Sequence, residues 1–303
     1  MMNRRPARRL CVAVGLVLAV VATLPAACGG STTTSASSPS QKGRFDKALH
    51  DQLPASVKAS GVLRVGTDPA YAPIESFGPD GHTIIGVDPD LGAAIGRVLG
   101  VRFQFVPTPF AKLLRDVASG DLDLAMSAIT DTPARAKTLD FVNYFSAGTS
   151  ILVQRGNPSG ITDMADLCGK IAAVESGTTQ VDLLARMQKN CGGLPIVVKK
   201  YVTNSDALLQ LRTGRAAATL NDFPTAAFIV NDPRTRSQYQ LASTVQYEPG
   251  LYGIVVTKSQ PSLREAVQGA CEALLRSGVY GGVLAQWGVQ DGALHRISIN
   301  TDR

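Results

Sequence analysis

An arginine close to an acidic turn motif is the first feature of this chain that could do chemistry. Asp131-Thr132-Pro133-Ala134-Arg135 follows an apolar stretch, and proline favours the first turn of a helix. The unpaired N–H groups at a helix start attract anions, and a guanidinium one turn later offers two parallel donors to a carboxylate. We therefore predict that a helix starts here and that Arg135 binds a carboxylate. The alternative is a surface arginine beside an ordinary helix cap.

A carboxylate occupies a comparable position in the second half of the chain. Residues 214–220 predict a strand that leads into Asn221-Asp222. Ligands of open α/β sheets bind outside the carboxyl ends of the strands, so the sequence places the Asp222 carboxylate at the cleft end of this strand. The alternative is an ordinary helix N-cap.

Patterns typical of catalysis or metal binding are missing from the sequence. The three histidines, His50, His82 and His295, stand far apart without ligand spacing, and there is no serine–histidine pairing or phosphate-binding loop. Glu175 is the one candidate for an acid or base. We expect no metal, no cofactor and no enzymatic activity.

Short apolar strands alternate with amphipathic helices from about residue 61 onward, which predicts an α/β fold with parallel strands. The first set comprises strands at 62–66, 102–106 and 122–128 and helices at 91–99 and 110–119. The second set comprises strands at 170–174, 195–198 and 216–220 and helices at 164–168, 179–190 and 206–212.

Two further extended stretches, at 149–154 and 252–256, separate these sets, and we interpret them as a hinge of two connecting strands. One lobe then comprises residues 45–150 and 254–303, and residues 151–253 form a second lobe inserted into the first. A ligand would bind in the cleft between the lobes.

The N-terminus has the layout of a secretory signal: four arginines, an apolar run at 10–24 and small residues before Cys28. The run is about 15 residues long, whereas a membrane-spanning helix needs about 20. The segment 24–30 looks like a bacterial lipobox, which predicts a signal peptide at 1–27 and lipidation of Cys28. Pro25 departs from the usual pattern, so plain signal-peptidase cleavage or a shifted site stays open, and the arginine pairs indicate twin-arginine export only weakly.

Residues 28–44 are rich in serine and threonine, which predicts a flexible tether. We expect a secreted protein that is held by its lipid on the outer face of the cell membrane. The formal charge of +6 includes four signal arginines, so the processed chain has 26 basic and 24 acidic residues, or +2. Such a balance lacks the basic stripe that nucleic-acid binding requires.

Three cysteines remain in the folded part, and one pair can form in an oxidising compartment. Cys168 precedes a predicted strand and Cys191 follows the next predicted helix, so we favour a Cys168–Cys191 bridge. Cys271 falls on the apolar side of a predicted helix, which is typical of a small buried residue.

Four separated motifs resemble family 3 extracellular solute-binding proteins, over about residues 60–292. They are residues 66–75 (GTDPAYAPIE), 86–91 (GVDPDL), 120–123 (GDLD) and 175–180 (ESGTTQ). This resemblance implies a type II periplasmic-binding-protein-like fold and a monomeric receptor that delivers a polar amino acid to the permease of an ATP-driven importer. Relatives include binders of histidine, of lysine, arginine and ornithine, and of glutamine.

The resemblance also implies roles for individual residues around the ligand backbone. Thr130 would bind both ligand ends, Arg135 the carboxylate and Asp222 the ammonium. The N–H of Thr179, next to Thr178, would cap the carboxylate, and Ala128 would contribute its backbone carbonyl.

For the ligand side chain, the resemblance implies that Tyr71 and Phe110 sandwich it and that four polar residues line the distal pocket: Asp68, Ser127, Glu175 and Gln180. Glu175 stands where relatives often have an apolar residue, and an acidic pocket favours a basic or glutamine-like side chain. Binding across the cleft would close the lobes. A dehydratase-like enzyme on the same fold and a receptor that signals to a membrane kinase are the alternatives.

Overall fold

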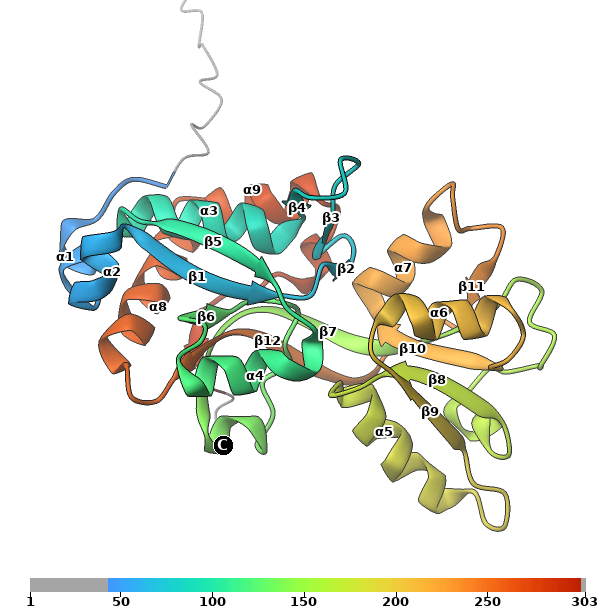
Figure 1. Cartoon of the computed structure of the whole chain (residues 1–303). Coiled ribbons are helices and arrows are strands. Elements are labelled where there is room, and N and C mark those ends of the chain that lie inside the picture. Colours follow the sequence, from blue (N-terminus) through green and yellow to red (C-terminus); the bar gives the residue numbers. More distant parts are fainter. Residues whose placement is uncertain (1–42, 301–303) are drawn as a thin grey trace, which may run out of the picture. The chain divides into compact units, whose positions relative to one another are not determined.

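The computed structural model describes residues 43–300. The predicted signal peptide, Cys28 and nearly all of the predicted tether therefore lie outside the described residues. Within residues 43–300, no helix is long and apolar enough to cross a membrane. These residues form two α/β lobes connected by two long strands, as predicted (Figure 1).

A single sheet runs through both lobes. Its strands follow the order β5, β1, β6, β12, β7, β10, β8, β9, and β11 and β13 also pair with β7. Their bounds are β1 Val62–Thr67, β5 Arg102–Pro107, β6 Leu124–Ala125, β7 Leu139–Gln154, β8 Ile171–Glu175, β9 Val197–Tyr201, β10 Ala218–Asp222, β11 Tyr239–Leu241, β12 Tyr247–Thr257 and β13 Ser298–Ile299. A smaller sheet contains β2 (Ala70–Tyr71), β3 (Glu75–Phe77) and β4 (Ile84–Ile85).

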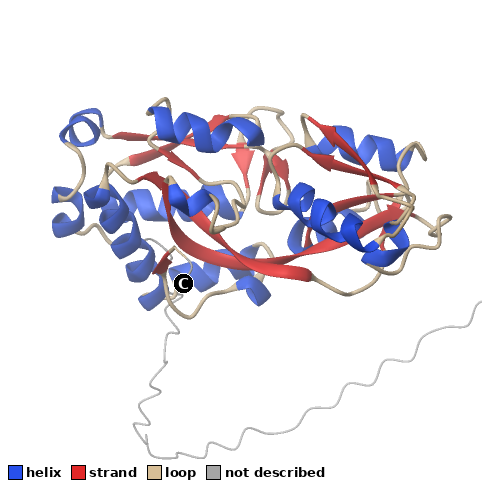
Figure 2. Ribbon diagram, turned by 90° about the horizontal axis from the view of Figure 1, so that it is seen from below, coloured by secondary structure: helices blue, strands red, loops and turns tan. Residues whose placement is uncertain are grey.

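The hinge consists of β7 and β12, which are antiparallel to each other and run from one lobe into the other (Figure 2). The β1 strand is parallel to β5 and β6 in the first lobe, and β8 is parallel to β9 and β10 in the second. The hinge strands pair antiparallel with β6 and β10, which makes the sheet continuous across the connection.

The helices cover the sheet within each lobe (Figure 1). Helices α8 and α9 follow β12 in the chain but pack against α3 of the first lobe, and their buried side chains share one core with β1 and α3. A separate core joins β8, β10 and α5. The helices are α1 Lys47–Asp51, α2 Ala55–Ser60, α3 Val87–Leu99, α4 Phe110–Ser119, α5 Thr179–Met187, α6 Asn204–Arg212, α7 Phe223–Asn231, α8 Pro261–Arg276 and α9 Val279–Gln286; the short 3-10 turns are η1 Arg135–Lys137, η2 Met164–Leu167, η3 Gln188–Asn190 and η4 Gln290–Gly292.

The prediction of a helix starting at Asp131 is wrong. The structure has only the three-residue turn η1, so this segment offers no helix N-terminus to an anion. The physical reason is pairing with the hinge: Thr130 forms a bridge with Tyr252, and the Asp131 N–H donates to the carbonyl of Leu251 at 2.8 Å. These contacts tie residues 130 and 131 to β12, so the chain turns only after them.

Several boundaries also differ from the prediction. The strand predicted at 122–128 is confined to β6, because the chain turns at Ala128, whose φ is 46°. The helix predicted at 164–168 is the 3-10 turn η2, and α3 begins four residues before the predicted start, at Val87. Pro89 lies in this first turn, where a missing N–H costs no helical hydrogen bond.

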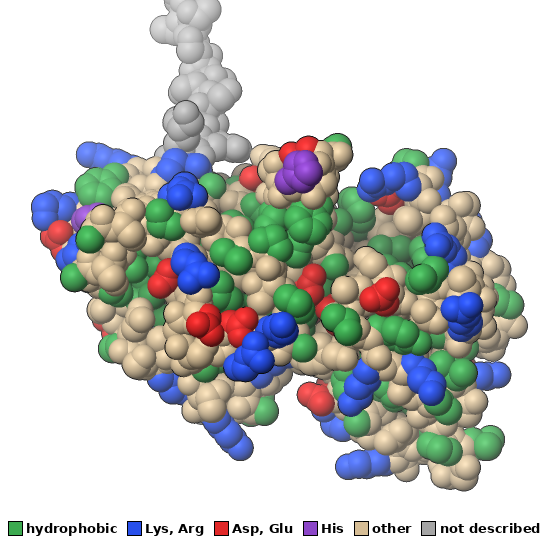
Figure 3. All heavy atoms as spheres, viewed as in Figure 1, with side chains coloured by type: hydrophobic (Ala, Val, Ile, Leu, Met, Phe, Trp, Pro, Cys, Tyr) green, Lys and Arg blue, Asp and Glu red, His purple; other side chains and the backbone are tan. Residues whose placement is uncertain are grey.

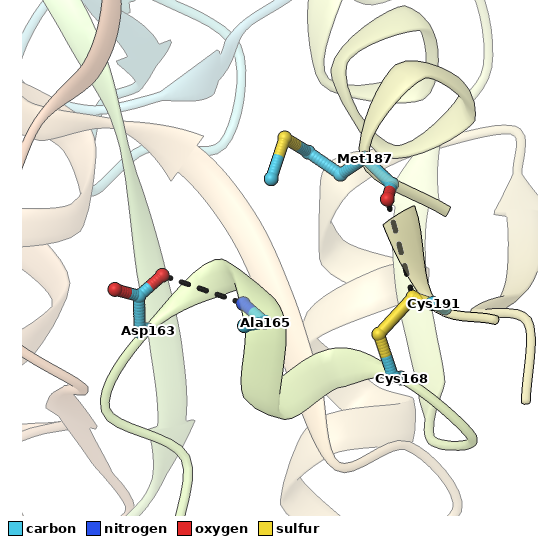
Figure 4. The surroundings of a disulfide bond; sticks show 5 residues. All are labelled: Asp163, Ala165, Cys168, Met187 and Cys191. Carbon is cyan, nitrogen blue, oxygen red and sulfur yellow. Dashed lines mark hydrogen bonds between the residues drawn. A yellow bond between two sulfur atoms is a disulfide. The ribbon is translucent and has the colours of Figure 1, made fainter. Parts of the chain in front are cut away.

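Cys168 and Cys191 form a disulfide with a Cα–Cα distance of 5.3 Å (Figure 4). The bridge ties the residue after η2 to the residue after η3. Cys271 is a free cysteine buried in the first core, and burial raises the pKa of its thiol to about 12.

Candidate functional site

A small pocket lies between the two lobes, and residues of both lobes line it. Every residue that the sequence nominated for ligand binding lines it except Asp68. The nominated lining residues are Tyr71, Phe110, Ser127, Ala128, Thr130, Arg135, Glu175, Thr178, Thr179, Gln180 and Asp222.

Arg135 reaches from the first lobe to the second. Its Nη1 donates to the carbonyl of Thr130 at 2.8 Å, and its Nη2 donates to the carbonyl of Gly177 at 2.9 Å. The guanidinium carbon also lies 5.9 Å from the ring centroid of Phe110. Burial lowers the pKa of Arg135, and the surrounding aspartates oppose that effect. Because a guanidinium has five donors, this cation keeps donors for an anionic ligand.

Asp222 ends β10 and precedes α7, but its side chain does not cap that helix. One carboxylate oxygen accepts from Gln180 Nε2 at 2.6 Å and from Thr149 Oγ1 at 3.2 Å. The other accepts from the Tyr252 hydroxyl at 2.8 Å. Burial raises the pKa of Asp222, while these donors and Arg135 lower it. Since two of the three donors come from the hinge strands, this carboxylate is anchored to the hinge.

The four residues predicted to line the distal pocket have different surroundings. Gln180 donates to Asp222, so its amide belongs to the same group of side chains as the predicted ammonium site. The Ser127 hydroxyl is fully buried, accepts from the Asp68 N–H and donates to Glu75. Only Glu175, of the four, presents an acidic group among the lining residues.

Residues 63–290 match the family model for bacterial extracellular solute-binding proteins, family 3. The chain belongs to this family. The arginine-binding protein of Corynebacterium glutamicum is 29% identical over 256 residues, which is 83% of this chain and 82% of that protein.

Solved structures of amino-acid-binding proteins are also similar to this chain. An ancestral arginine-binding protein bound to arginine has 31% identity and a TM-score of 0.69, covering 75% of this chain and 98% of that one. An ancestral amino acid-binding protein described as a precursor of cyclohexadienyl dehydratase has 29% identity and a TM-score of 0.68, covering 77% and 97%. The relatives of this solute-binding protein are thus named as amino-acid binders, and family members are extracellular.

Glu175 of this solute-binding protein ends β8 and is only 3% exposed. Its Oε2 accepts a hydrogen bond from the hydroxyl of Tyr71 in the first lobe. Burial and the neighbouring Asp68 carboxyl raise the pKa of Glu175 to about 9. Asp68 lies behind the lining residues, where its Oδ2 accepts from the Phe110 N–H at 2.9 Å.

The two predicted aromatic residues do not form a parallel sandwich. The ring centroids of Tyr71 and Phe110 are 6.1 Å apart and the rings are inclined at 54°. Phe110 packs beside the Arg135 guanidinium, and Tyr71 directs its hydroxyl at Glu175. Each ring therefore also orients a charged or acidic group of the pocket.

Five lining residues were missed by the sequence analysis: Asn204, Leu220, Asn221, Thr225 and Tyr252. Two of them connect the lobes, because Asn204 Nδ2 donates to the Ala70 carbonyl and Thr225 Oγ1 donates to the Tyr71 carbonyl, both at 3.3 Å. Asn221 is 1% exposed and its amide has no hydrogen-bond partner among the described residues. Its position directly before Asp222 at a strand end was the available signal.

A second buried acidic pair lies behind the pocket. Asp88 accepts from the Tyr144 hydroxyl at 2.7 Å, and burial raises the pKa of Asp88 to about 7. Burial and Asp88 raise the pKa of Glu75 well above its usual value. The motif at 86–91 contributed to the family resemblance, but the sequence did not show that its aspartate faces a buried glutamate.

Proposed function

We propose that this protein captures a polar amino acid with a basic or glutamine-like side chain outside the cell and delivers it to an ATP-driven permease. The supporting observation is that Arg135 and Asp222, from different lobes, line one pocket. A cation and an anion in one small pocket suit the carboxylate and the ammonium of a single zwitterion. In this proposal the N–H of Thr179, at the first turn of α5, adds a donor for the ligand carboxylate.

Cleft closure is the proposed mechanism of capture. Arg135 joins Gly177, Tyr71 joins Glu175, and Asn204 joins Ala70, so three contacts from the second lobe meet the first around the pocket. A ligand that contacts both lobes stabilises the closed state by its differential affinity. Several charge-assisted hydrogen bonds of about 1.5–3 kcal/mol each could support micromolar binding, which needs about 8 kcal/mol.

Lipid anchoring and permease docking complete the proposal. Cys28 within its lipobox-like segment would hold the protein at the outer face of the membrane. In the view of Figure 3, acidic and basic side chains are spread over both lobes. This distribution fits a protein that binds a small molecule better than one that binds nucleic acid.

A thermal-shift screen of the purified protein against the twenty amino acids, ornithine and citrulline tests the proposal. A bound ligand stabilises the folded state by mass action, so we expect a shift with basic amino acids or glutamine. A screen in which none of these compounds shifts the melting temperature would contradict the proposed function.

A dehydratase is the second candidate, because Glu175 is a buried carboxyl group with a raised pKa and could donate a proton. The similarity to a dehydratase precursor makes this comparison specific. We expect the purified protein to leave prephenate and arogenate unchanged. Conversion of either compound at an enzymatic rate would favour the enzyme.

A further inference from the structure

A pair of carboxyl groups, those of Glu175 and Asp68, lies where Glu175 lines the pocket. Glu175, at the end of β8, and Asp68, just after β1, are 3% and 6% exposed, and the two carboxyl groups are near enough that each shifts the pKa of the other. Two ionised carboxylates are both acceptors and repel each other. A pair this deeply buried is therefore satisfied only when it holds a proton or when a cation approaches it.

Other contacts of the pair fit a shared proton. Tyr71 donates to Oε2 of Glu175, and Oε1 has no hydrogen-bond partner among the described residues. Asp68 accepts from the Phe110 N–H. Only Glu175 of the pair lines the pocket, so a ligand side chain reaches the pair through Glu175.

No cation among the described residues is bonded to this pair. From the first lobe, Tyr71 and Glu75 lie near the pair, and from the second lobe the backbone N–H of Asn204 in α6 lies near Glu175. Tyr201 of β9 pairs with Glu175 in the sheet, while Lys199 and Lys200 of that strand are exposed. Arg135 donates to Thr130 and Gly177 instead.

We propose that Glu175 determines ligand specificity by exchanging a proton for a cation: a cationic side-chain end replaces the proton that Glu175 shares with Asp68, whereas a neutral end leaves that proton in place. The inference rests on the proposed function, because it assumes that the pocket binds an amino acid. The proton goes to solvent, so one positive charge leaves the site for each one that arrives. A neutral end instead accepts a hydrogen bond from the protonated carboxyl group.

L-arginine and L-citrulline form the matched ligand pair for the test. They have the same length and nearly the same shape, and only arginine is cationic. Isothermal titration calorimetry at pH 7 in buffers of different ionisation enthalpy gives the number of protons released on binding. Asp222 meets the same ammonium group in both complexes, so its contribution cancels in the difference between the two ligands. We expect arginine to release about one proton more than citrulline.

Glu175→Gln is the test variant and Glu265→Gln, at an exposed position of α8, is the matched control. In Glu175→Gln the difference in proton release should fall to near zero. The dissociation constant for arginine should rise by about tenfold or more, because a charge-assisted hydrogen bond is lost. Glu265→Gln should behave like the unmodified protein.

Equal proton release by arginine and citrulline in the unmodified protein would overturn the inference, whether or not the variant folds. Unchanged arginine affinity in folded Glu175→Gln would also overturn it. In both cases amino-acid binding, and hence the proposed function, would remain. Absence of binding by every amino acid in the thermal-shift screen would overturn the proposed function and the inference together.

Discussion

Replacement of Arg135 by alanine should weaken ligand binding strongly. The guanidinium joins the lobes through the carbonyls of Thr130 and Gly177 and packs beside Phe110. Loss of one charge-assisted hydrogen bond to a ligand carboxylate removes about 1.5–3 kcal/mol, and loss of the bond to Gly177 removes about 1 kcal/mol from the closed state. A total of about 2.5–4 kcal/mol corresponds to a dissociation constant raised roughly 50- to 1,000-fold.

Isothermal titration calorimetry with L-arginine, or with whichever amino acid the thermal-shift screen identifies, measures this effect. Arg276→Ala is the control, since Arg276 is an exposed arginine of α8 that pairs with Glu272, and it should change the affinity by less than about twofold. Arg135→Lys should fall between the two, because a lysine keeps the charge but lacks the planar fork. An affinity of folded Arg135→Ala within threefold of the unmodified protein would refute this account of the site.

Three further predictions concern closure, pH and the disulfide. Gly177→Ala should raise the dissociation constant for the ligand about fivefold or more, because the new Cβ would lie 3.1 Å from the Ala111 Cα of the other lobe and would hinder closure. Gly156→Ala is the control: this glycine has a similar positive φ but open space around it, so the substitution should lower the stability and leave the affinity unchanged. The melting temperature should fall as pH rises from about 4 to 9, because burial raises the pKa values of Asp88 (about 7) and Glu175 (about 9), and the folded state then holds protons that the unfolded chain has released. Asp88→Asn should make the melting temperature depend less on pH, and a melting temperature of the unmodified protein that does not change with pH would contradict this prediction. Replacing Cys168 and Cys191 by serine should lower the free energy of unfolding, measured by urea denaturation, by about 3 kcal/mol, because the disulfide closes a loop of 23 residues. A reductant should not change the free energy of unfolding of this variant any further.

The sequence predicted the fold well where local pattern and tertiary structure agree. Helix α4 begins and ends at the predicted residues, because its apolar spacing matches the buried face and Gly120 adopts the left-handed conformation that ends a helix. The prediction of a helix after Thr130 was wrong because pairing with Leu251 and Tyr252, more than 100 residues away in the sequence, overrides the local helical preference. A contact at that separation leaves no trace in a local pattern.

The sequence indicated most of the residues that line the pocket, but not the contacts between them. Strand-end positions and motif order nominated Arg135, Asp222 and Glu175, all of which line the pocket. Periodicity carries no information about which side chains face each other across two lobes. The bonds from Gln180 to Asp222 and from Tyr71 to Glu175 therefore became visible only in three dimensions.

The pairing of the two hinge strands has a consequence for how this protein can be modified. Ala147 of β7 lies opposite Gly250 of β12, so the chain enters and leaves the second lobe at neighbouring points of one ladder. Opposite residues of an antiparallel pair have Cα atoms only about 4.5–5.5 Å apart. The second lobe could thus be exchanged with that of a relative by joining the two chains at two neighbouring positions of the hinge. Such a chimera would combine Arg135 from the first lobe of this protein with the residues that take the places of Glu175 and Asp222 in the relative.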